Sequence, residues 1–275
     1  QDMTTTVCNS VYTPTNATEL TTPKAIMIDK LAAQAGKYEV ISDNTSPNVA
    51  QSTLSDIRDG KTYTVRKMAD GNCWMAENLK FELQANKTYT GVNNTTGNTI
   101  TFNTGAVCGN GNTNAACIMN GNTAYGSTYD TWYYNWYAAT AGSGTSSMTM
   151  DSGDATNSIC PAHWRLPTNY TNKQYPSGGA PKSWGSLVKA YGISPENHAS
   201  DSEWQTLVAQ PFSLPRAGYF RSGAFQNNGR GYWWSSTAYS TATYAYHLVF
   251  YTTLVYPQSY YDYKYDGFNV RCVSI

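Results

Sequence analysis

The closing segment of the chain, SYYDYKYDGFNVRCVSI, contains two alternating patterns of side chains. Tyr261, Tyr263 and Tyr265 occupy every second position, and an apolar alternation follows from Phe268 to Cys272. Side chains two apart on a strand point to the same face, so the patterns predict two surfaces separated by a turn at Asp266-Gly267. We predict that the apolar surface is buried and that the tyrosines are presented.

Tyrosine is well suited to binding. It fixes only two side-chain torsions when it binds, and it offers a large flat apolar area and a hydroxyl that donates or accepts. Antibody-like binding surfaces favour Tyr, Ser, Asn and Gly for this reason, and the same four types crowd residues 219–265. The segment therefore predicts a ligand-binding surface in which a few anchors each contribute about 2 kcal/mol or more.

The alternative is that these tyrosines pack inside strands, because Tyr has a high strand propensity and is commonly half-buried. We adopt that alternative for Tyr219 and Tyr232. We predict exposure for five others, because a turn at Pro257 and the charged residues Asp262 and Lys264 interrupt them. These five are Tyr256, Tyr260, Tyr261, Tyr263 and Tyr265.

Metal and phosphate chemistry have little support in the sequence. The three histidines, His163, His198 and His247, lie far apart and lack the spacing of a zinc site. No nucleophile elbow, phosphate-binding glycine loop or dinucleotide fingerprint is present. Asp151 and Asp154 resemble a weak calcium loop but lack the spaced oxygen donors of an EF-hand. We therefore expect no cofactor, and structural calcium stays open.

Most tryptophans are expected in the core or at its edge, and this interpretation covers Trp74, Trp164, Trp204, Trp233 and Trp234. A sugar-stacking tryptophan is the alternative. Its candidates are Trp184 and Trp234.

The bulk composition excludes some partners. Charged residues make up 13% of the chain, and 18 basic residues balance 18 acidic ones, so no basic field attracts nucleic acid or an anionic membrane. No apolar run approaches the roughly 20 residues that span a bilayer. The chain begins at Gln1 without Met, as a mature protein does after signal cleavage, although an expression start is also compatible.

Six cysteines without paired CxxC motifs favour disulfides over zinc, and disulfides indicate an oxidising compartment. We therefore expect an extracellular or cell-surface location. The preferred pairing joins Cys108 to Cys117 across a Gly/Asn-rich loop, Cys160 to Cys272, and Cys8 to Cys73. Sequence alone leaves the other pairings open.

Turn and cap patterns outline the elements that must position the tyrosines. Residues 1–58 form an N-terminal extension with a short helix between Thr22 and Gly36, and residues 59–275 form the main domain. Tyr63 and Val65 alternate between two Asp-Gly turns, which predicts a hairpin. Short helices are expected over 181–192 and 200–210, aromatic residues 130–140 should pack inward, and strands are expected at 231–237, 243–251 and 267–273.

The orientation of one strand is ambiguous. Tyr244 and Tyr246 share a parity with the apolar residues Leu248 and Phe250, so exposure of the tyrosines conflicts with burial of the other two. We place Tyr244 outward and leave Tyr246 open.

Six motifs occur in an order that resembles the Fibrobacter succinogenes major paralogous domain, a bacterial surface and secreted module. They are DGNCWMAENL, YYNWYAAT, ICPAHWRLPT, SEWQTL, GYWWSST and GFNVRCV. The resemblance covers about residues 55–275. It implies a C-type lectin-like fold of the formylglycine-generating-enzyme type: an α+β body with short helices packed on twisted antiparallel strands, long polar loops and disulfides.

The C-terminal segment also resembles the variable proteins of diversity-generating retroelements, which often end in a Gly-Phe-x-Val-Arg pattern like that of Gly267 to Arg271. In those systems adenine randomisation of Asn codons yields a restricted set of residue types. Gln258 and Lys264 fall outside that set. The resemblance implies a variable-type ligand-binding segment at about 219–266. Its candidate residues are Tyr239, Ser240, Thr243, Tyr244, Tyr251, Thr253, Leu254, Tyr256, Ser259, Tyr260, Tyr261, Tyr263 and Tyr265.

The sequence thus predicts a non-enzymatic, secreted or surface-displayed protein that binds a protein or glycan on another cell. A structural surface or filament subunit, with the same aromatic face buried between copies, is the alternative. A formylglycine-generating-type oxidase is the third hypothesis, because enzymes of that type use paired reactive cysteines. The sequence indicates neither the ligand nor the oligomeric state.

Overall fold

The computed structural model describes residues 38–43, 51–56, 59–68, 70–81, 88–89, 100–101, 118–119, 132–161, 164–169, 183–190, 213–226, 229–251 and 254–274. The predicted helices at 22–36 and 200–210, and Trp204, lie outside these ranges. None of the helices within them has the length and apolar content of a membrane span.

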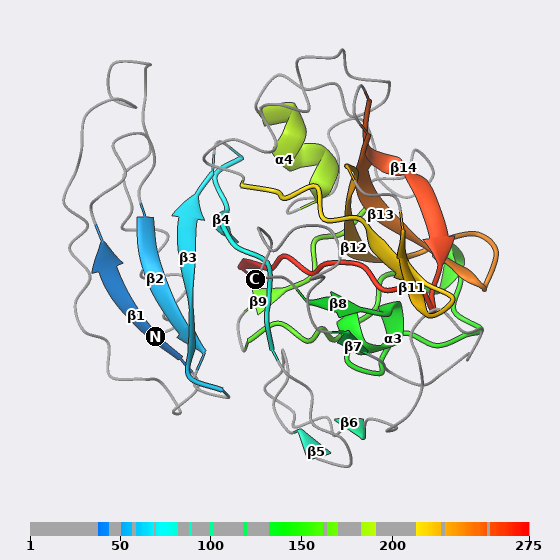
Figure 1. Ribbon diagram of the computed structural model, residues 1–275, viewed down its shortest axis with the longest axis horizontal. Coiled ribbons are helices and arrows are strands. Elements are labelled where there is room, and N and C mark those ends of the chain that lie inside the picture. The colour runs from blue at the N-terminus through cyan, green and yellow to red at the C-terminus, as the bar shows by residue number, and fades with distance from the viewer. Residues whose placement is uncertain are drawn as a thin grey trace.

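A six-stranded sheet forms one side of the molecule, with strand order β1-β2-β3-β4-β15-β9 (Figure 1). Its strands are β1 (Tyr38–Asp43), β2 (Gln51–Asp56), β3 (Lys61–Lys67), β4 (Cys73–Met75), β9 (Trp164–Arg165) and β15 (Val273–Ser274). The predicted hairpin is confirmed, since β3 pairs antiparallel with β4. The predicted boundary at residue 58 falls between β2 and β3, which also pair, and it stays a prediction.

A three-stranded antiparallel sheet, β12-β13-β14, forms the opposite side (Figure 1). Its strands are β12 (Gly231–Ala238), β13 (Tyr244–Phe250) and β14 (Val255–Tyr263). Short two-stranded pairs are made by β5 (Thr88–Tyr89) with β6 (Ile100–Thr101), β7 (Ile118–Met119) with β8 (Tyr133–Tyr134), and β10 (Tyr219–Arg221) with β11 (Ala224–Gln226).

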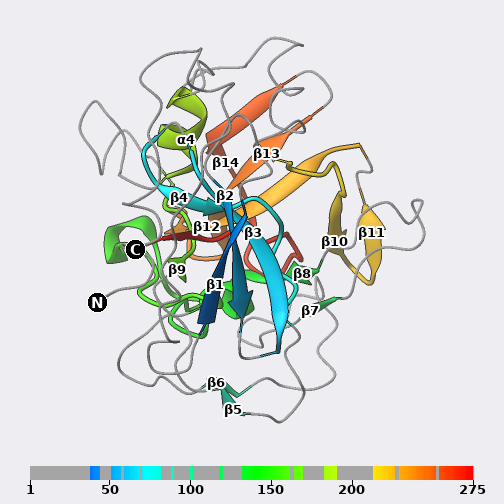
Figure 2. The same cartoon turned by 90° about the vertical axis from the view of Figure 1, so that its left-hand side faces the viewer.

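Helices contribute little to the described residues. They are α3 (Trp136–Ala139), α4 (Trp184–Ala190) and a 3-10 turn at Met150–Ser152. The predicted helix at 181–192 is confirmed in its centre by α4. The α+β class is wrong, because antiparallel strands build most of the described structure and the helices are single short segments between them (Figure 2). The cap and turn patterns of the sequence identified individual elements, but the proportion of strand to helix depends on how the strands pair.

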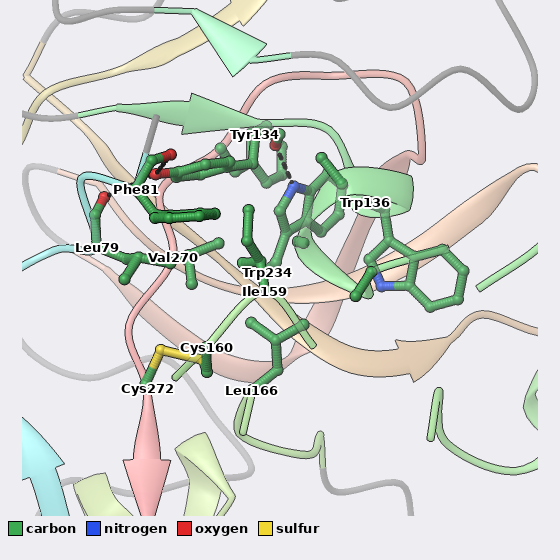
Figure 3. Close-up of a cluster of buried hydrophobic side chains, with 14 of the residues drawn as sticks. Leu79, Phe81, Tyr134, Trp136, Ile159, Cys160, Leu166, Trp234, Val270 and Cys272 are labelled. Carbon is green, nitrogen blue, oxygen red and sulfur yellow. Dashed lines mark hydrogen bonds between the residues drawn. A yellow bond between two sulfur atoms is a disulfide. The ribbon is translucent and has the colours of Figure 1, made fainter. Parts of the chain in front are cut away.

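Buried hydrophobic clusters join the two sheets. Tyr63 and Val65 from β3 and Trp234 from β12 belong to the same buried cluster. The Trp234 indole donates to the Tyr134 carbonyl at 2.8 Å (Figure 3). The Trp234 ring also stacks on Phe268, with centroids 4.2 Å apart. The inward packing predicted for 130–140 is thus confirmed within the described residues 132–140.

The C-terminal segment crosses between the sheets, and its predicted apolar alternation is confirmed. Phe268, Val270 and Cys272 are fully buried. The turn before them lies one or two residues earlier than predicted, because the Asp266 amide donates to the Tyr263 carbonyl at 2.9 Å.

The predicted Cys160–Cys272 disulfide is confirmed, and both cysteines belong to the buried cluster that contains Trp234 (Figure 3). Cys73 is also disulfide-bonded. Its partner lies outside the described ranges, as do Cys8, Cys108 and Cys117, so the other two pairings stay predictions.

Candidate functional site

Tyrosines from three neighbouring segments meet on one face of the three-stranded sheet. Tyr244 on β13 lies opposite Tyr263 on β14, and Tyr246 lies opposite Tyr261. Cross-strand partners point to the same face of a sheet, so the four side chains gather there. We call this group, together with the following two residues, the tyrosine face. They are Tyr239, just after β12, and Tyr265, just after β14.

The rings of the tyrosine face pack against one another. Tyr239 and Tyr261 stack with centroids 3.6 Å apart and planes inclined by 15°. Tyr263 and Tyr265 stack at 4.7 Å and 13°. Tyr244 connects the two stacks, since its ring lies 5.4 Å from Tyr261 and 4.7 Å from Tyr263. Each ring therefore restricts the orientation of its neighbours.

Solvent access is concentrated on β14. Tyr261 is 40% exposed and Tyr260 is 36% exposed, and they are the large hydrophobic side chains that stand out most among the described residues. Tyr246 is the most buried of the tyrosine face, with 9% of its surface exposed. The other members of the tyrosine face are half-buried.

The hydroxyls of Tyr244, Tyr246 and Tyr261 have raised pKa values and remain protonated at neutral pH. Hydrogen bonding with Tyr263 raises the pKa of Tyr244, and hydrogen bonding with Tyr239 raises the pKa of Tyr261. Burial raises the pKa of Tyr246 to about 12. These phenols therefore offer both a donor and an acceptor to a ligand.

A second group of rings lies on the other face of the same strands. Tyr256 and Tyr260 pack at 4.4 Å, and Tyr251 touches both at 5.6 and 5.7 Å. The Arg230 guanidinium lies 4.2 Å from the centroid of the Tyr251 ring. Burial raises the pKa of Tyr251, so its hydroxyl is also neutral.

An ion cluster supports the end of β14. Arg221, on β10, donates to Asp262 at 2.6 Å and makes two bonds to the buried carboxylate of Asp266. Its guanidinium also lies 5.5 Å from the ring centroid of Tyr263. The imidazole of His247, on β13, is fully buried with its Nε2 atom 3.4 Å from Asp262 Oδ2. The cluster ties three strands together directly beneath the tyrosine face.

Lys264 anchors the turn between Tyr263 and Tyr265. Its ammonium is buried, donates to the carbonyls of Thr145 and Met148 at 2.9 and 2.7 Å, and lies 4.6 Å from the ring centroid of Trp136. Burial lowers the pKa of Lys264 to about 8.

The sequence pattern of the family described as the Fibrobacter succinogenes major domain matches residues 68–274, which is more than half of the chain. The chain belongs to this family. No curated protein and no solved structure matches it, and the lectin-like architecture expected with the α+β class has no support from a structural relative. In this member of the family, the tyrosine face lies near the C-terminal end of the matched region.

The structure places most of the predicted ligand-binding residues on or beside the two tyrosine groups of this Fibrobacter succinogenes major domain. Ser240 and Thr243 are exposed in the loop between β12 and β13, and Leu254 is half-buried before β14. Thr253 lies outside the described residues, and so does the side chain of Ser259. Their role in binding stays a prediction, like that of the tyrosines.

Lys264 and Asp262 were predicted to keep their tyrosine neighbours exposed, and this prediction is wrong for Lys264. Lys264 is completely buried and Asp262 is half-buried, because carbonyls, a tryptophan ring and Arg221 satisfy their charges. Only Tyr260 and Tyr261 of the five tyrosines expected at the surface are exposed, and the other three are half-buried. Burial of Tyr219 and Tyr232 is confirmed.

The sugar-stacking alternative for Trp184 and Trp234 is wrong, since both rings are fully buried. The Asp154 carboxylate accepts a bond from the Thr237 hydroxyl. Among the described residues, no group of acidic, histidine or cysteine side chains has the arrangement of a metal site. The sequence did not decide the orientation of Tyr246 and indicated no role for Arg221. Its pairing opposite Tyr261 places Tyr246 on the tyrosine face, but no local sequence pattern indicates the contacts of Arg221.

Proposed function

We propose that this chain is a secreted or surface-displayed binding protein, and that the tyrosine face binds a protein or glycan on another cell without catalysis. The observation that carries the proposal is the stack of Tyr239 on the exposed ring of Tyr261 within a set of interlocked tyrosines. Large exposed aromatic surface is uncommon on a soluble protein unless it serves an interaction. Rings already held in place lose little freedom on binding.

Two further features support this proposal. The Cys160–Cys272 disulfide fits a protein that works in an oxidising compartment. It also leaves neither sulfur as the free thiol that an oxidase of the formylglycine-generating type would need. The family membership agrees with a role at the bacterial surface as the motifs imply.

We also propose that the tyrosine face is diversified by a retroelement. The residues of the tyrosine face have types that adenine randomisation can produce. Lys264 has a type that it cannot produce, and its side chain is buried, where it donates to the Thr145 carbonyl. The neighbouring DNA tests this idea. A near-copy of the codons for residues 230–275, with mismatches confined to adenines and a reverse transcriptase gene beside it, is expected. A template copy with mismatches at all bases would contradict it.

The binding function is tested with intact bacterial cells. Labelled chain is titrated against a panel of cells, and a variant with Tyr244→Ala and Tyr261→Ala is titrated in parallel. We expect saturable binding to some cells, weakened about a hundredfold in the variant if each ring contributes about 1–2 kcal/mol. Loss of binding after protease treatment of the cells indicates a protein ligand, and loss after periodate treatment indicates a glycan.

The control is Lys189→Ala, on the exposed side of α4, which should bind as the unmodified chain does. Equal binding by all three chains, or by none, would contradict the proposal. The mass of the purified chain in solution tests the alternative: polymers that grow with concentration, and that the double variant does not form, would indicate a filament subunit.

A further inference from the structure

The free edge of β14 is next to the tyrosine face. Among the described residues, β14 pairs with β13 on one side and with no strand on the other. Such an edge displays unpaired backbone groups that accept another strand. Pro257 lies on this strand, and proline is tolerated in sheets mainly on edges.

The register shows which backbone groups face outward. The Lys264 amide donates to the Thr243 carbonyl at 3.0 Å, and in an antiparallel ladder every second residue bonds to the same neighbour. Asp262 and Tyr260 therefore bond toward β13, while Tyr261 and Tyr263 direct their amides to the free edge. The Tyr263 carbonyl is occupied by the Asp266 amide, so the outward set is the Tyr261 amide, the Tyr261 carbonyl and the Tyr263 amide.

Aromatic side chains flank this edge on both faces of the sheet. Tyr261 stands with the tyrosine face, and Tyr260 packs against Tyr251 and Tyr256 on the other face. Consecutive residues of a strand point to opposite faces, so the two most exposed rings lie on either side of one line of backbone donors and acceptors. The carboxylate that follows them on the strand, Asp262, is paired with Arg221.

We propose that the end of β14 binds an extended segment of a protein ligand as an added strand, with alternate side chains of that segment resting on Tyr260 and Tyr261. The inference rests on the proposed function and deepens it, because it assigns the ligand to polypeptides. Three outward backbone groups in strand spacing match the donors and acceptors of a peptide backbone. Aromatic walls favour apolar or aromatic side chains at alternate positions.

The first experiment uses short linear peptides selected from a display library on the purified full chain. Amide hydrogen exchange of the chain is then measured with and without a selected peptide. We expect the Tyr261 and Tyr263 amides to exchange quickly in the free chain and to be slowed about tenfold or more by the peptide. The Asp262 amide, already bonded to β13, should change little. Slowing without this alternation, or failure to select any peptide, would overturn the proposal.

A second measurement methylates the backbone nitrogens of the selected peptide one at a time. Strand addition predicts that methylation weakens binding about tenfold or more at alternate positions and has little effect between them. Tyr261→Pro, which removes an outward amide, should bind the peptide more weakly than Tyr261→Ala, which removes the ring alone. If the proline variant unfolds, the patterns of hydrogen exchange and of backbone methylation still show whether the peptide binds as an added strand.

The outcomes separate this inference from the proposed function. Cell binding that depends on Tyr244 and Tyr261, together with a methylation scan that shows no alternation, would keep the tyrosine face as a binding site and exclude strand addition. Peptide binding with the alternating pattern, but no binding to cells, would support strand addition and count against the cell-surface ligand.

Discussion

The rings of Tyr239 and Tyr261 lie face to face, with centroids 3.6 Å apart, although β13 lies between β12, which Tyr239 follows, and β14, which carries Tyr261. The contact is possible because Tyr239 belongs to the loop that leaves β12, where its amide bonds to the Tyr244 carbonyl at 3.0 Å. The stack thus connects all three strands across the tyrosine face. It also covers part of the apolar surface that an isolated ring on β14 would expose.

This stack should appear as an energetic coupling. We expect a double-mutant cycle of Tyr239→Ala and Tyr261→Ala to give an interaction of about 1 kcal/mol in the free energy of unfolding, because aromatic pairs add about 0.5–1.5 kcal/mol beyond area burial. Chemical denaturation of the four proteins measures it. The pair Tyr239 and Tyr260, on opposite faces, is the control and should be additive. Additivity in both pairs would mean that the stack contributes nothing.

Lys264 makes stability depend on pH in alkaline solution. Its pKa is about 8 in the folded chain and about 10.5 when unfolded, so the unfolded chain binds more protons between these values. The free energy of unfolding should therefore rise with pH in this window, by up to about 3 kcal/mol. Denaturation between about pH 7.5 and 9.5, below the titration of exposed tyrosines, measures the slope. Lys264→Met should remove this slope, and an unchanged slope would contradict the assignment.

The sequence was sufficient where neighbouring residues decide the outcome. The alternation of Phe268, Val270 and Cys272 identified buried positions, and the Asp-Gly turns identified the β3–β4 hairpin. The parity of Tyr261 and Tyr263 correctly placed them on one face. The overall class was wrong because the proportion of sheet depends on pairings between distant segments, such as β15 with β4 and β9, which no local pattern specifies.

The same distinction explains the error about charges. Lys264 and Asp262 were expected to resist burial because charged side chains are rarely buried without a partner, and the sequence does not show which distant groups pair with them. Their partners are the carbonyls of Thr145 and Met148 and the guanidinium of Arg221, all far away along the chain. The parity of the tyrosines can therefore be read from the sequence, whereas the groups that support them require the tertiary structure.

The Cys160–Cys272 disulfide should provide much of the stability, because its cysteines are 112 residues apart. Closing a loop of this length restricts the unfolded chain by about 4–5 kcal/mol. We expect the variant with Cys160→Ala and Cys272→Ala to lose free energy of unfolding on that scale in chemical denaturation. Under reducing conditions the variant and the unmodified chain should differ much less, since both then lack this crosslink. An unchanged stability without reductant would contradict the expectation.

Arg221 should be required for the stability of the end of β14. Its removal in Arg221→Met leaves the fully buried Asp266 carboxylate without its cation, and an uncompensated buried charge costs about 3–5 kcal/mol. Burial already raises the pKa of Asp266 to about 6, above its ordinary value, so protonation favours the folded chain and the variant should regain stability as pH falls from about 7 to 5. Adding Asp266→Asn should restore part of the loss at neutral pH, because it removes the orphaned charge. Equal stability of the single and double variants at pH 7 would show that this ion cluster does not support β14.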